Sequence, residues 1–344
     1  MTSSTETQVT EPPGGPGEPD ETTADVPKDI AELVGLSPGQ LMWRRFRRDR
    51  TGVVAAYVVI FFFAIAILAP VISKLYGKNP YTLYGEANPD LLNEFAYPVG
   101  PNGGMSSHFW FGIEPRLGRD VFTQLLYGIR TSLGIAVAVT IAVTITAILL
   151  GIAGGYLGGK PDYFIGRISD LLMAFPSQLF FVAFMPVVVS IFVSPADATP
   201  TYLRVVALIA VQWFLGWMGL ARLLRGQVLT LREREFIEAA RVTGASPWRI
   251  IRHELLPNLV TPILVQSTLM LPGFVTAEAG LSFLGVGLVE PTPDWGRMFA
   301  KGGQIYQNDL TYMFFPGIAM VVFIVAFNLL GDSVRDAFDP KTAR

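Results

Sequence analysis

Few residue types in this chain could carry out chemistry. The 344 residues include no cysteine, which excludes disulfides, thiolate metal ligands and cysteine nucleophiles. Of the two histidines, His108 and His253, the second sits beside arginine, so ordinary surface roles are favoured over a metal site or catalytic dyad. No metal site is predicted. An intramembrane protease would need paired aspartates, a serine with a histidine, or an HExxH helix, and the apolar segments contain no such set.

A second group of candidates consists of polar side chains inside strongly apolar segments. Those that could line a path through a membrane are Glu278, Gln212, Gln266 and Asn328. A carboxylate at mid-membrane depth costs roughly 2.5–3.5 kcal/mol on insertion scales, so it should face a partner or water. For Glu278, a structural ion pair or hydrogen bond is favoured over a place on the path. For Gln212 and Gln266, hydrogen bonds between helices are favoured over contacts with a solute.

The elements that would position these residues are transmembrane helices. Hydrophobic residues make up 51% of the chain, which is more apolar surface than the core of a soluble domain would bury. A helix of about 20 apolar residues spans the hydrocarbon layer. Six segments satisfy this requirement, at about 53–72, 132–156, 171–193, 203–223, 259–280 and 312–330. The sequence therefore predicts an all-α polytopic membrane protein with six transmembrane helices.

The distribution of arginine predicts the orientation. A cationic block, residues 43–50, precedes the first apolar segment, and basic residues favour the cytoplasmic side. The connection 222–258 carries seven arginines against four glutamates, a net charge of +3. The long connection 76–131 has no basic cluster, as expected for an external segment. Both termini are therefore predicted to be cytoplasmic. No pattern indicates nucleic-acid binding.

The same patterns divide the chain into segments of different character. Residues 1–35 lack the apolar side chains that a folded core requires and are predicted to form a disordered acidic cytoplasmic tail. The remaining predicted segments are an amphipathic, basic region with the first transmembrane helix (36–75), the external connection (76–131), a core of five transmembrane helices (132–331) with a polar loop at 232–258, and a cytoplasmic tail (332–344).

Glycine and proline predict how the helices pack and bend. Glycines recur every four residues at Gly151, Gly155 and Gly159, a spacing that lets helices approach closely, within one subunit rather than between subunits. Pro176 and Pro272 are expected to break or bend the third and fifth apolar segments. The turn 291–295 suits equally an external contact and a stiff interfacial turn.

The polar loop between the fourth and fifth apolar segments predicts a docking element. A helix is expected over 232–242, and Gly244 is well placed to end it in the left-handed conformation. Ser246 and Pro247 then favour the start of a second helix with Trp248, Ile251 and Leu255 on one stripe. Two short helices set at a fixed angle suit insertion into a groove of another protein. The alternative is a loop that only connects two membrane spans.

This loop resembles a known family. Glu238-Ala239-Ala240, Gly244 and Leu256-Pro257 resemble the EAA loop of binding-protein-dependent ABC importer permeases, although the frequent isoleucine of that pattern is Glu254 here. Further segments are similar to the C-type permease of dipeptide and oligopeptide transporters: residues 43–50, 118–120, 125–128, 170–177, 280–287, 291–296 and 328–332. The resemblance covers the chain from about residue 40 to its end.

The resemblance implies a type I ABC importer permease fold in a bacterial or archaeal cell membrane. It also implies four kinds of partner: membrane lipid, a homologous second permease, two cytoplasmic ATPases and an extracytoplasmic substrate-binding protein. The ATPase-coupling residues carried over are Glu238, Ala239, Ala240, Gly244, Trp248, Leu256 and Pro257. The chain has no GxxxxGK[ST] loop to cradle phosphates, so ATP and Mg²⁺ are expected on the partner ATPases and no cofactor on this chain.

Two questions stay open from the sequence. Di- and oligopeptides are the expected cargo, but relatives for nickel, glutathione or another small solute share these motifs. A secondary transporter or channel that works without an ATPase is the other class of function. That class leaves the capped pair of polar helices unexplained.

Overall fold

The computed structural model describes residues 38–194, 197 and 199–338. The predicted tail 1–35 and the last residues, 339–344, lie outside this described part. The chain divides into two compact units, Met1–Arg45 and Phe46–Arg344. The division falls within helix α2 (Pro38–Arg48).

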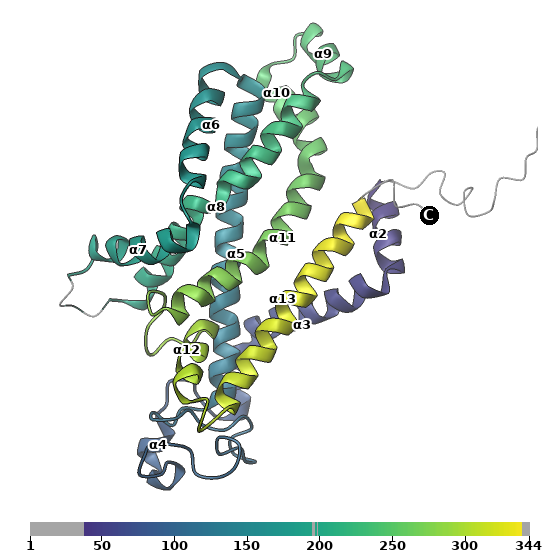
Figure 1. The fold of residues 1–344 in the computed structure, drawn as a ribbon. Coiled ribbons are helices and arrows are strands. Elements are labelled where there is room, and N and C mark those ends of the chain that lie inside the picture. Colours follow the sequence, from purple (N-terminus) through teal and green to yellow (C-terminus); the bar gives the residue numbers. More distant parts are fainter. Residues whose placement is uncertain (1–37, 195–196, 198, 339–344) are drawn as a thin grey trace, which may run out of the picture. The chain divides into compact units, whose positions relative to one another are not determined.

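The second unit is built of helices (Figure 1). In chain order they are α3 (Arg50–Tyr76), α4 (Tyr84–Ala87), the 3₁₀ turn η1 (Pro89–Leu91), α5 (Val121–Ile152), the π turn η2 (Ala153–Leu157), α6 (Gly159–Met173), α7 (Ser177–Ser190), α8 (Thr201–Leu231), α9 (Glu235–Val242), α10 (Pro247–Ile250), the π turn η3 (Ile251–Leu255), α11 (Leu256–Phe283), α12 (Trp295–Ile305) and α13 (Thr311–Phe338). Extended pairing in the described residues is limited to two isolated bridges.

Five helices are long and apolar enough to cross a membrane, and a bent pair provides a sixth candidate. The pair is α6 and α7, which meet at 92°. Pro176 is the N-cap residue of α7, where its missing N–H removes a helical hydrogen bond, so the predicted break in the third segment is confirmed. A break at Pro272 is not found, because α11 runs through this buried residue to Phe283. The predicted all-α polytopic fold is confirmed.

The predicted external connection 76–131 is longer than the one in the structure. Helix α5 begins at Val121, eleven residues before the expected start, because Asp120 caps it and its Oδ1 accepts a hydrogen bond from Thr123 N at 2.7 Å. The additional turns of α5 contain Gln124 and Arg130. Because these side chains are polar, the apolar pattern in the sequence did not extend over this part of the helix.

Two buried apolar clusters share helices α5 and α11. One joins them to α7, α8, α9 and α10, with Leu208 and Leu224 fully buried. The other joins them to α3, α12 and α13, around Trp295 and Phe323. α5 and α11 therefore connect the two sides of the bundle.

Glycine allows the closest helix contact. A Cβ at Gly151 would lie 2.8 Å from the carbonyl oxygen of Ala221, and a Cβ at Gly155 would lie 2.8 Å from Cβ of Val228. Both neighbours belong to α8 of the same chain, so packing within one subunit is confirmed for these two glycines. A Cβ at Gly159 would meet nothing within 4 Å.

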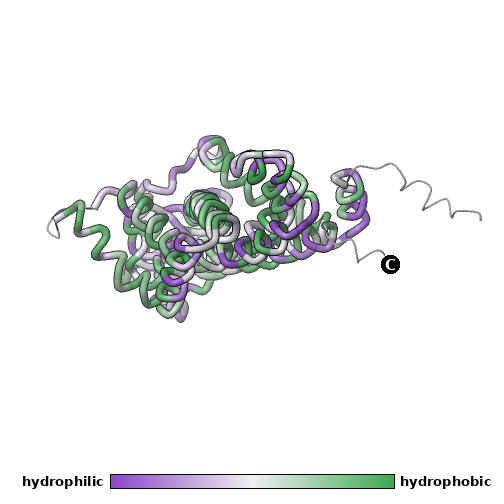
Figure 2. Tube along the Cα trace, turned by 90° about the horizontal axis from the view of Figure 1, so that it is seen from above, coloured by the Kyte–Doolittle hydropathy of each residue, from purple (hydrophilic) through white to green (hydrophobic). Residues whose placement is uncertain are grey.

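The outer surface of the long helices is apolar. On α3, Ile67 is 74% exposed, and Tyr57 and Phe61 are exposed as well. The tube in Figure 2 shows hydrophobic stretches on outer as well as inner helical segments. An exposed apolar surface of this extent fits contact with lipid.

Candidate functional site

The loop between α8 and α11 folds as a capped element at one end of the bundle, labelled α9 and α10 in Figure 1. Helix α9 ends in a Schellman motif, in which Ala245 N donates to Ala240 O at 3.0 Å and Gly244 N donates to Arg241 O at 3.0 Å. Gly244 has φ +82°, the left-handed conformation expected for it. We call residues 235–257 the coupling element, after the ATPase-coupling role that the resemblance leads us to expect.

The second half of the coupling element begins as predicted but does not end as predicted. Ser246 Oγ accepts a hydrogen bond from Arg249 N at 3.4 Å, and Pro247 is the first residue of α10. The second short helix is found as α10, but it is not separate from the next span, because it continues through η3 into α11 as one helix, Pro247–Phe283. Since Pro257 has no N–H to donate, the helix widens to a π turn just before it instead of stopping.

One side of the coupling element packs against the bundle. Ile237 and Leu255 are fully buried, and Ile250 is 1% exposed, all within the cluster of α5 and α8. Ile251 and Ala240 are partly buried against the same cluster. The stripe predicted for the second helix is therefore shifted, with Ile250 and Leu255 facing inward and Trp248 facing outward. Burial of these side chains fixes the element to the helices that it joins.

The other side of the coupling element is a free, partly apolar surface. Val242 is 89% exposed and Trp248 is 68% exposed, and Phe236 is exposed beside them. The carried-over positions Glu238, Ala239, Gly244 and Pro257 are also exposed, whereas Ala240 and Leu256 are partly buried. Exposed large apolar side chains at the tip of an ordered polar loop are typical of a protein interface.

The four predicted path residues do not come together. Glu278 and Gln212 are fully buried, Gln266 is partly buried and Asn328 is exposed on α13. Gln212 Nε2 donates to Leu208 O, 3.4 Å away in the same helix, so the predicted bond between helices is not made. Other side chains within the long helices do join them, among them Thr144 Oγ1 with Ser267 Oγ, at 2.9 Å, and Trp213 Nε1 with Thr146 Oγ1, at 2.8 Å. Such residues are too common in apolar segments to be singled out from sequence.

Glu278 lies in a buried polar cluster at the end of α11 that is far from the coupling element. Ser282 Oγ is 3.4 Å from Glu278 Oε1, and Asp294, the N-cap of α12, is also fully buried. One oxygen of each carboxyl group has no partner among the described residues. Burial raises the pKa of Asp294 to about 6. Gly296 permits this close contact, because a Cβ there would lie 2.1 Å from Ala279 O.

Trp295 adjoins this cluster and is fully buried between Phe62 and Phe323. Of the two interpretations of the turn 291–295, an external contact through Trp295 is therefore wrong. The backbone N–H of Trp295 donates to Ser132 Oγ at 3.3 Å, which ties the start of α12 to α5.

An ion network holds the connection after α3 against α12. Glu114 is 1% exposed and accepts hydrogen bonds from Arg119 at 2.5 and 2.9 Å, and from Lys301. Glu290 pairs with Arg119 at 2.7 Å, and also with Arg297 and Lys301. Burial alone would raise the pKa of the Glu290 carboxyl, but hydrogen bonds from Arg119 and Lys301 and the charge on Arg297 lower it to about 2. Burial would lower the pKa of Arg119, but Glu114 raises it above its ordinary value.

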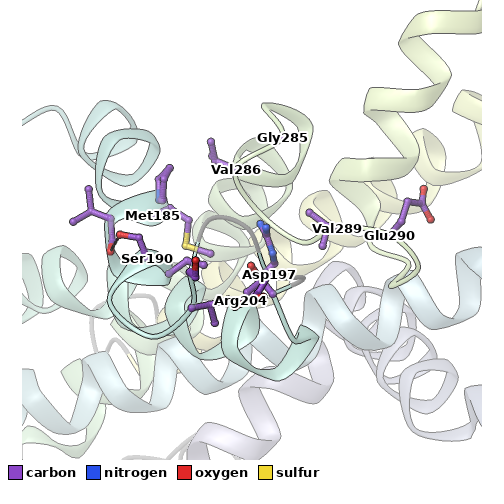
Figure 3. Close-up of a pocket in the computed structure, with 14 residues that line it drawn as sticks. Met185, Ser190, Asp197, Arg204, Gly285, Val286, Val289 and Glu290 are labelled. Atoms are coloured by element: carbon purple, nitrogen blue, oxygen red, sulfur yellow. Dashed lines mark hydrogen bonds between the residues drawn. The ribbon is translucent and has the colours of Figure 1, made fainter.

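A cavity of about 730 Å³ opens next to this network (Figure 3). Its walls come from α7, from described residues between α7 and α8, from the first turn of α8 and from the segment between α11 and α12. They include Met185, Val189, Asp197, Arg204 and Glu290. None of the four predicted path residues lines it. Sequence reasoning did not identify Arg204, although an arginine near the start of an otherwise apolar segment is a detectable signal.

Ion pairs also join α6 to α8. Arg222 Nη2 is 2.6 Å from Asp170 Oδ1, and Arg225 binds both carboxylate oxygens of Asp162. Groups of three or more histidine, cysteine, aspartate or glutamate side chains that could hold a metal are absent between residues 38 and 338, as far as these residues are described.

Two family models match the sequence. Residues 147–344 match the binding-protein-dependent transport system inner membrane component, and residues 37–96 match the N-terminal TM domain of oligopeptide transport permease C. Together they cover the coupling element, the long helices around it and the region of α2 and α3.

Several curated proteins are similar over most of their length. The dipeptide transport system permease protein DppC of Bacillus subtilis is 34% identical over 92% of this chain and 90% of its own length. The protein of the same name from Alkalihalophilus pseudofirmus is 32% identical over 93% and 95%. The glutathione transport system permease protein GsiD of Pectobacterium atrosepticum is 34% identical over 89% and 92%.

A solved structure of the MetNI methionine ABC transporter, in an inward-facing conformation, contains a chain with a similar fold. The TM-score is 0.51 with 19% identity, over 68% of this chain and 100% of that chain. The family model spans more than half of the chain. The chain therefore belongs to the binding-protein-dependent transport system inner membrane components, the multi-pass permease subunits of ABC importers.

Proposed function

We propose that this chain is one permease subunit of an ATP-driven importer of di- and oligopeptides. It pairs with a homologous second permease, binds two cytoplasmic ATPases through the coupling element and receives solute from an extracytoplasmic binding protein. The observation that carries the proposal is the coupling element itself, an ordered tip fixed to two long helices by Ile237, Ile250 and Leu255. The names of the similar dipeptide permeases support peptides as the cargo.

The orientation follows from charge. The arginine-rich segment that contains the coupling element is cytoplasmic, so the α4 end and the ion network of Glu114 are external. An ATPase groove then receives the exposed Phe236, Val242 and Trp248, with Glu238 and Ala239 on the same tip. ATP and Mg²⁺ bind the ATPases and not this chain, which has no phosphate-binding loop.

Substitutions in the coupling element test the docking. Glu238→Lys places the wrong charge on the exposed face, and Gly244→Pro cannot adopt φ +82°. Both variants are expected to insert in the membrane as the wild type does, but to lose the ATPase on copurification and to lose peptide uptake. Glu233→Lys, an exposed residue before α9, is the matched control for charge. Normal uptake by both coupling variants would remove the docking proposal.

Glutathione is the second candidate cargo, because permeases named for glutathione transport are 34–36% identical to this chain. A competition experiment distinguishes peptides from glutathione as the cargo. In cells that carry the complete system, an excess of unlabelled dialanine should block uptake of a labelled dipeptide. Equal or stronger block by glutathione would favour the second candidate.

A further inference from the structure

The cavity beside α7 contains an arginine that forms no ion pair among the described residues. Arg204 lies in the first turn of α8, and Figure 3 shows it beside Asp197, with Met185 and Val289 on either side. Its Nη1 donates to Gly287 O at 3.2 Å. Its Nε is buried and has no hydrogen-bond partner, and no carboxylate lies within ion-pair distance of it among the described residues.

The other carboxylates of this region leave the charge uncompensated. Glu290 also lines the cavity, but Arg119, Arg297 and Lys301 hold its carboxylate. Asp197 is exposed on the rim and makes no ion pair with Arg204. Arg119, Arg222 and Arg225 each form an ion pair with a carboxylate, and Arg204 differs from them in this respect.

Arg204 is partly buried, and among the described residues Gly287 O is the one protein acceptor that its guanidinium bonds, so its buried Nε–H has lost water without gaining a partner there. The planar fork of N–H donors matches a carboxylate, to which it can donate two parallel hydrogen bonds. The volume of about 730 Å³ lies in the usual range of small-molecule sites and accommodates a short peptide.

The position of the cavity fits the arrival of solute. Arg204 lies at the end of α8 that is remote from the coupling element, and Thr201 in the same turn is 3.2 Å from Thr292, oxygen to oxygen. In the orientation proposed above this is the external end, where a binding protein would release its cargo.

We propose that Arg204 binds the carboxylate of the transported peptide as it enters this cavity from the external side. The inference rests on the proposed function and extends it, since it names the group on the cargo that the permease recognises. Gly287 O orients the guanidinium, and the apolar wall from Met185 to Val289 contacts the remainder of the peptide. A peptide whose terminal carboxylate is replaced by an amide loses this contact.

Direct binding tests the proposal without the selectivity of the binding protein. The permease pair with its ATPases is placed in nanodiscs with a non-hydrolysable nucleotide, and equilibrium binding of labelled dialanine is compared with that of its C-terminal amide. Wild type should bind dialanine at least about tenfold more tightly, or ~1.4 kcal/mol. Arg204→Gln should reduce the affinity for dialanine to that for the amide, and Arg204→Lys should restore part of it. Arg116→Gln, an exposed external arginine outside the cavity, should match wild type.

Equal affinity of wild type and Arg204→Gln for dialanine would overturn the proposal. So would an affinity that changes only when phosphatidylglycerol replaces a neutral lipid, since the guanidinium would then bind a lipid phosphate. Uptake into proteoliposomes with the binding protein separates this failure from failure of the proposed function. If wild type imports no peptide the function is wrong, whereas equal import by wild type and Arg204→Gln contradicts the Arg204 site alone.

Discussion

At the scale of single residues, the ion network of Glu114 and Glu290 joins the connection between α3 and α5 to α12. The partners come from positions far apart in the chain, with Glu290 171 residues after Arg119. Because Glu114 is buried and accepts bonds from two cations, the loss of either cation would leave an incompletely compensated buried charge.

The stability of this region should depend on acidity. The pKa of Glu290 lies at about 2 in the folded chain, below the ordinary value of 4.5, so its ionised form stabilises the fold above about pH 5. That stabilisation is lost as the pH falls from about 5 to about 2. Glu290→Gln should lower the thermal unfolding midpoint at pH 7 and flatten the decline in acid. Glu94→Gln, on an exposed residue, is the control and should leave both unchanged.

Residues with local partners could be predicted from the sequence, whereas residues with distant partners could not. Gly244, Ser246 and Pro247 satisfy backbone groups within a few positions, so their types alone indicated the turn. Arg119 and Glu290 are distant in the sequence, and only the folded chain brings them together. Arg204 is the reverse case, since its proposed role is inferred from an unpartnered Nε and from the absence of an ion pair among the described residues, which only the structure reveals.

Helices form the next scale, and the contact of α5 with α8 depends on glycine. Gly151→Ala would place a Cβ 2.8 Å from Ala221 O and 2.9 Å from Cβ of Leu224, so the helices would have to separate. Overpacking of this kind costs about 1–3 kcal/mol. Gly226 on α8 has nothing within 4 Å of a Cβ, and Gly226→Ala should stabilise by up to about 1 kcal/mol through helix propensity.

Thermal unfolding of the purified subunit in detergent measures both variants. The expected order of midpoints is Gly226→Ala, wild type, then Gly151→Ala. A midpoint of Gly151→Ala at or above that of wild type would mean that the α5–α8 contact is not the tight one described.

Of the two prolines expected to break or bend helices, Pro176 lies at a break and Pro272 does not. Pro176 ends up at a helix start, with the 92° bend before α7, but Pro272 lies inside α11 in the same kind of apolar segment. The sequence near both residues is apolar, so the difference arises from the neighbours. The missing N–H of Pro272 leaves Thr268 O without its usual helical partner, but Pro272 is buried, and the packing around it keeps α11 continuous. Such compensation by the surroundings is not visible in one sequence.

At the scale of the whole second unit, one helix connects the coupling element with the region of the Arg204 cavity. The continuous helix of α10, η3 and α11 has 37 residues, about 55 Å at 1.5 Å per residue. It begins in the coupling element and reaches the buried Glu278 beside Asp294 and α12. In the proposed function, a displacement of the tip by an ATPase would be passed along this continuous helix to the end that adjoins the Arg204 cavity.

Interrupting that helix should separate docking from transport. Inserting Gly-Gly-Ser between Leu256 and Pro257 leaves the tip and its anchors Ile237 and Ile250 intact but makes the joint flexible. The ATPase should still copurify, whereas peptide uptake should fall at least about tenfold and ATP hydrolysis should no longer respond to the loaded binding protein. The same insertion between Glu94 and Phe95, both exposed, is the control and should keep hydrolysis and uptake coupled. If the variant with the flexible joint transports as wild type does, α11 does not carry the motion, and the other connection of the coupling element, through α8, must do so.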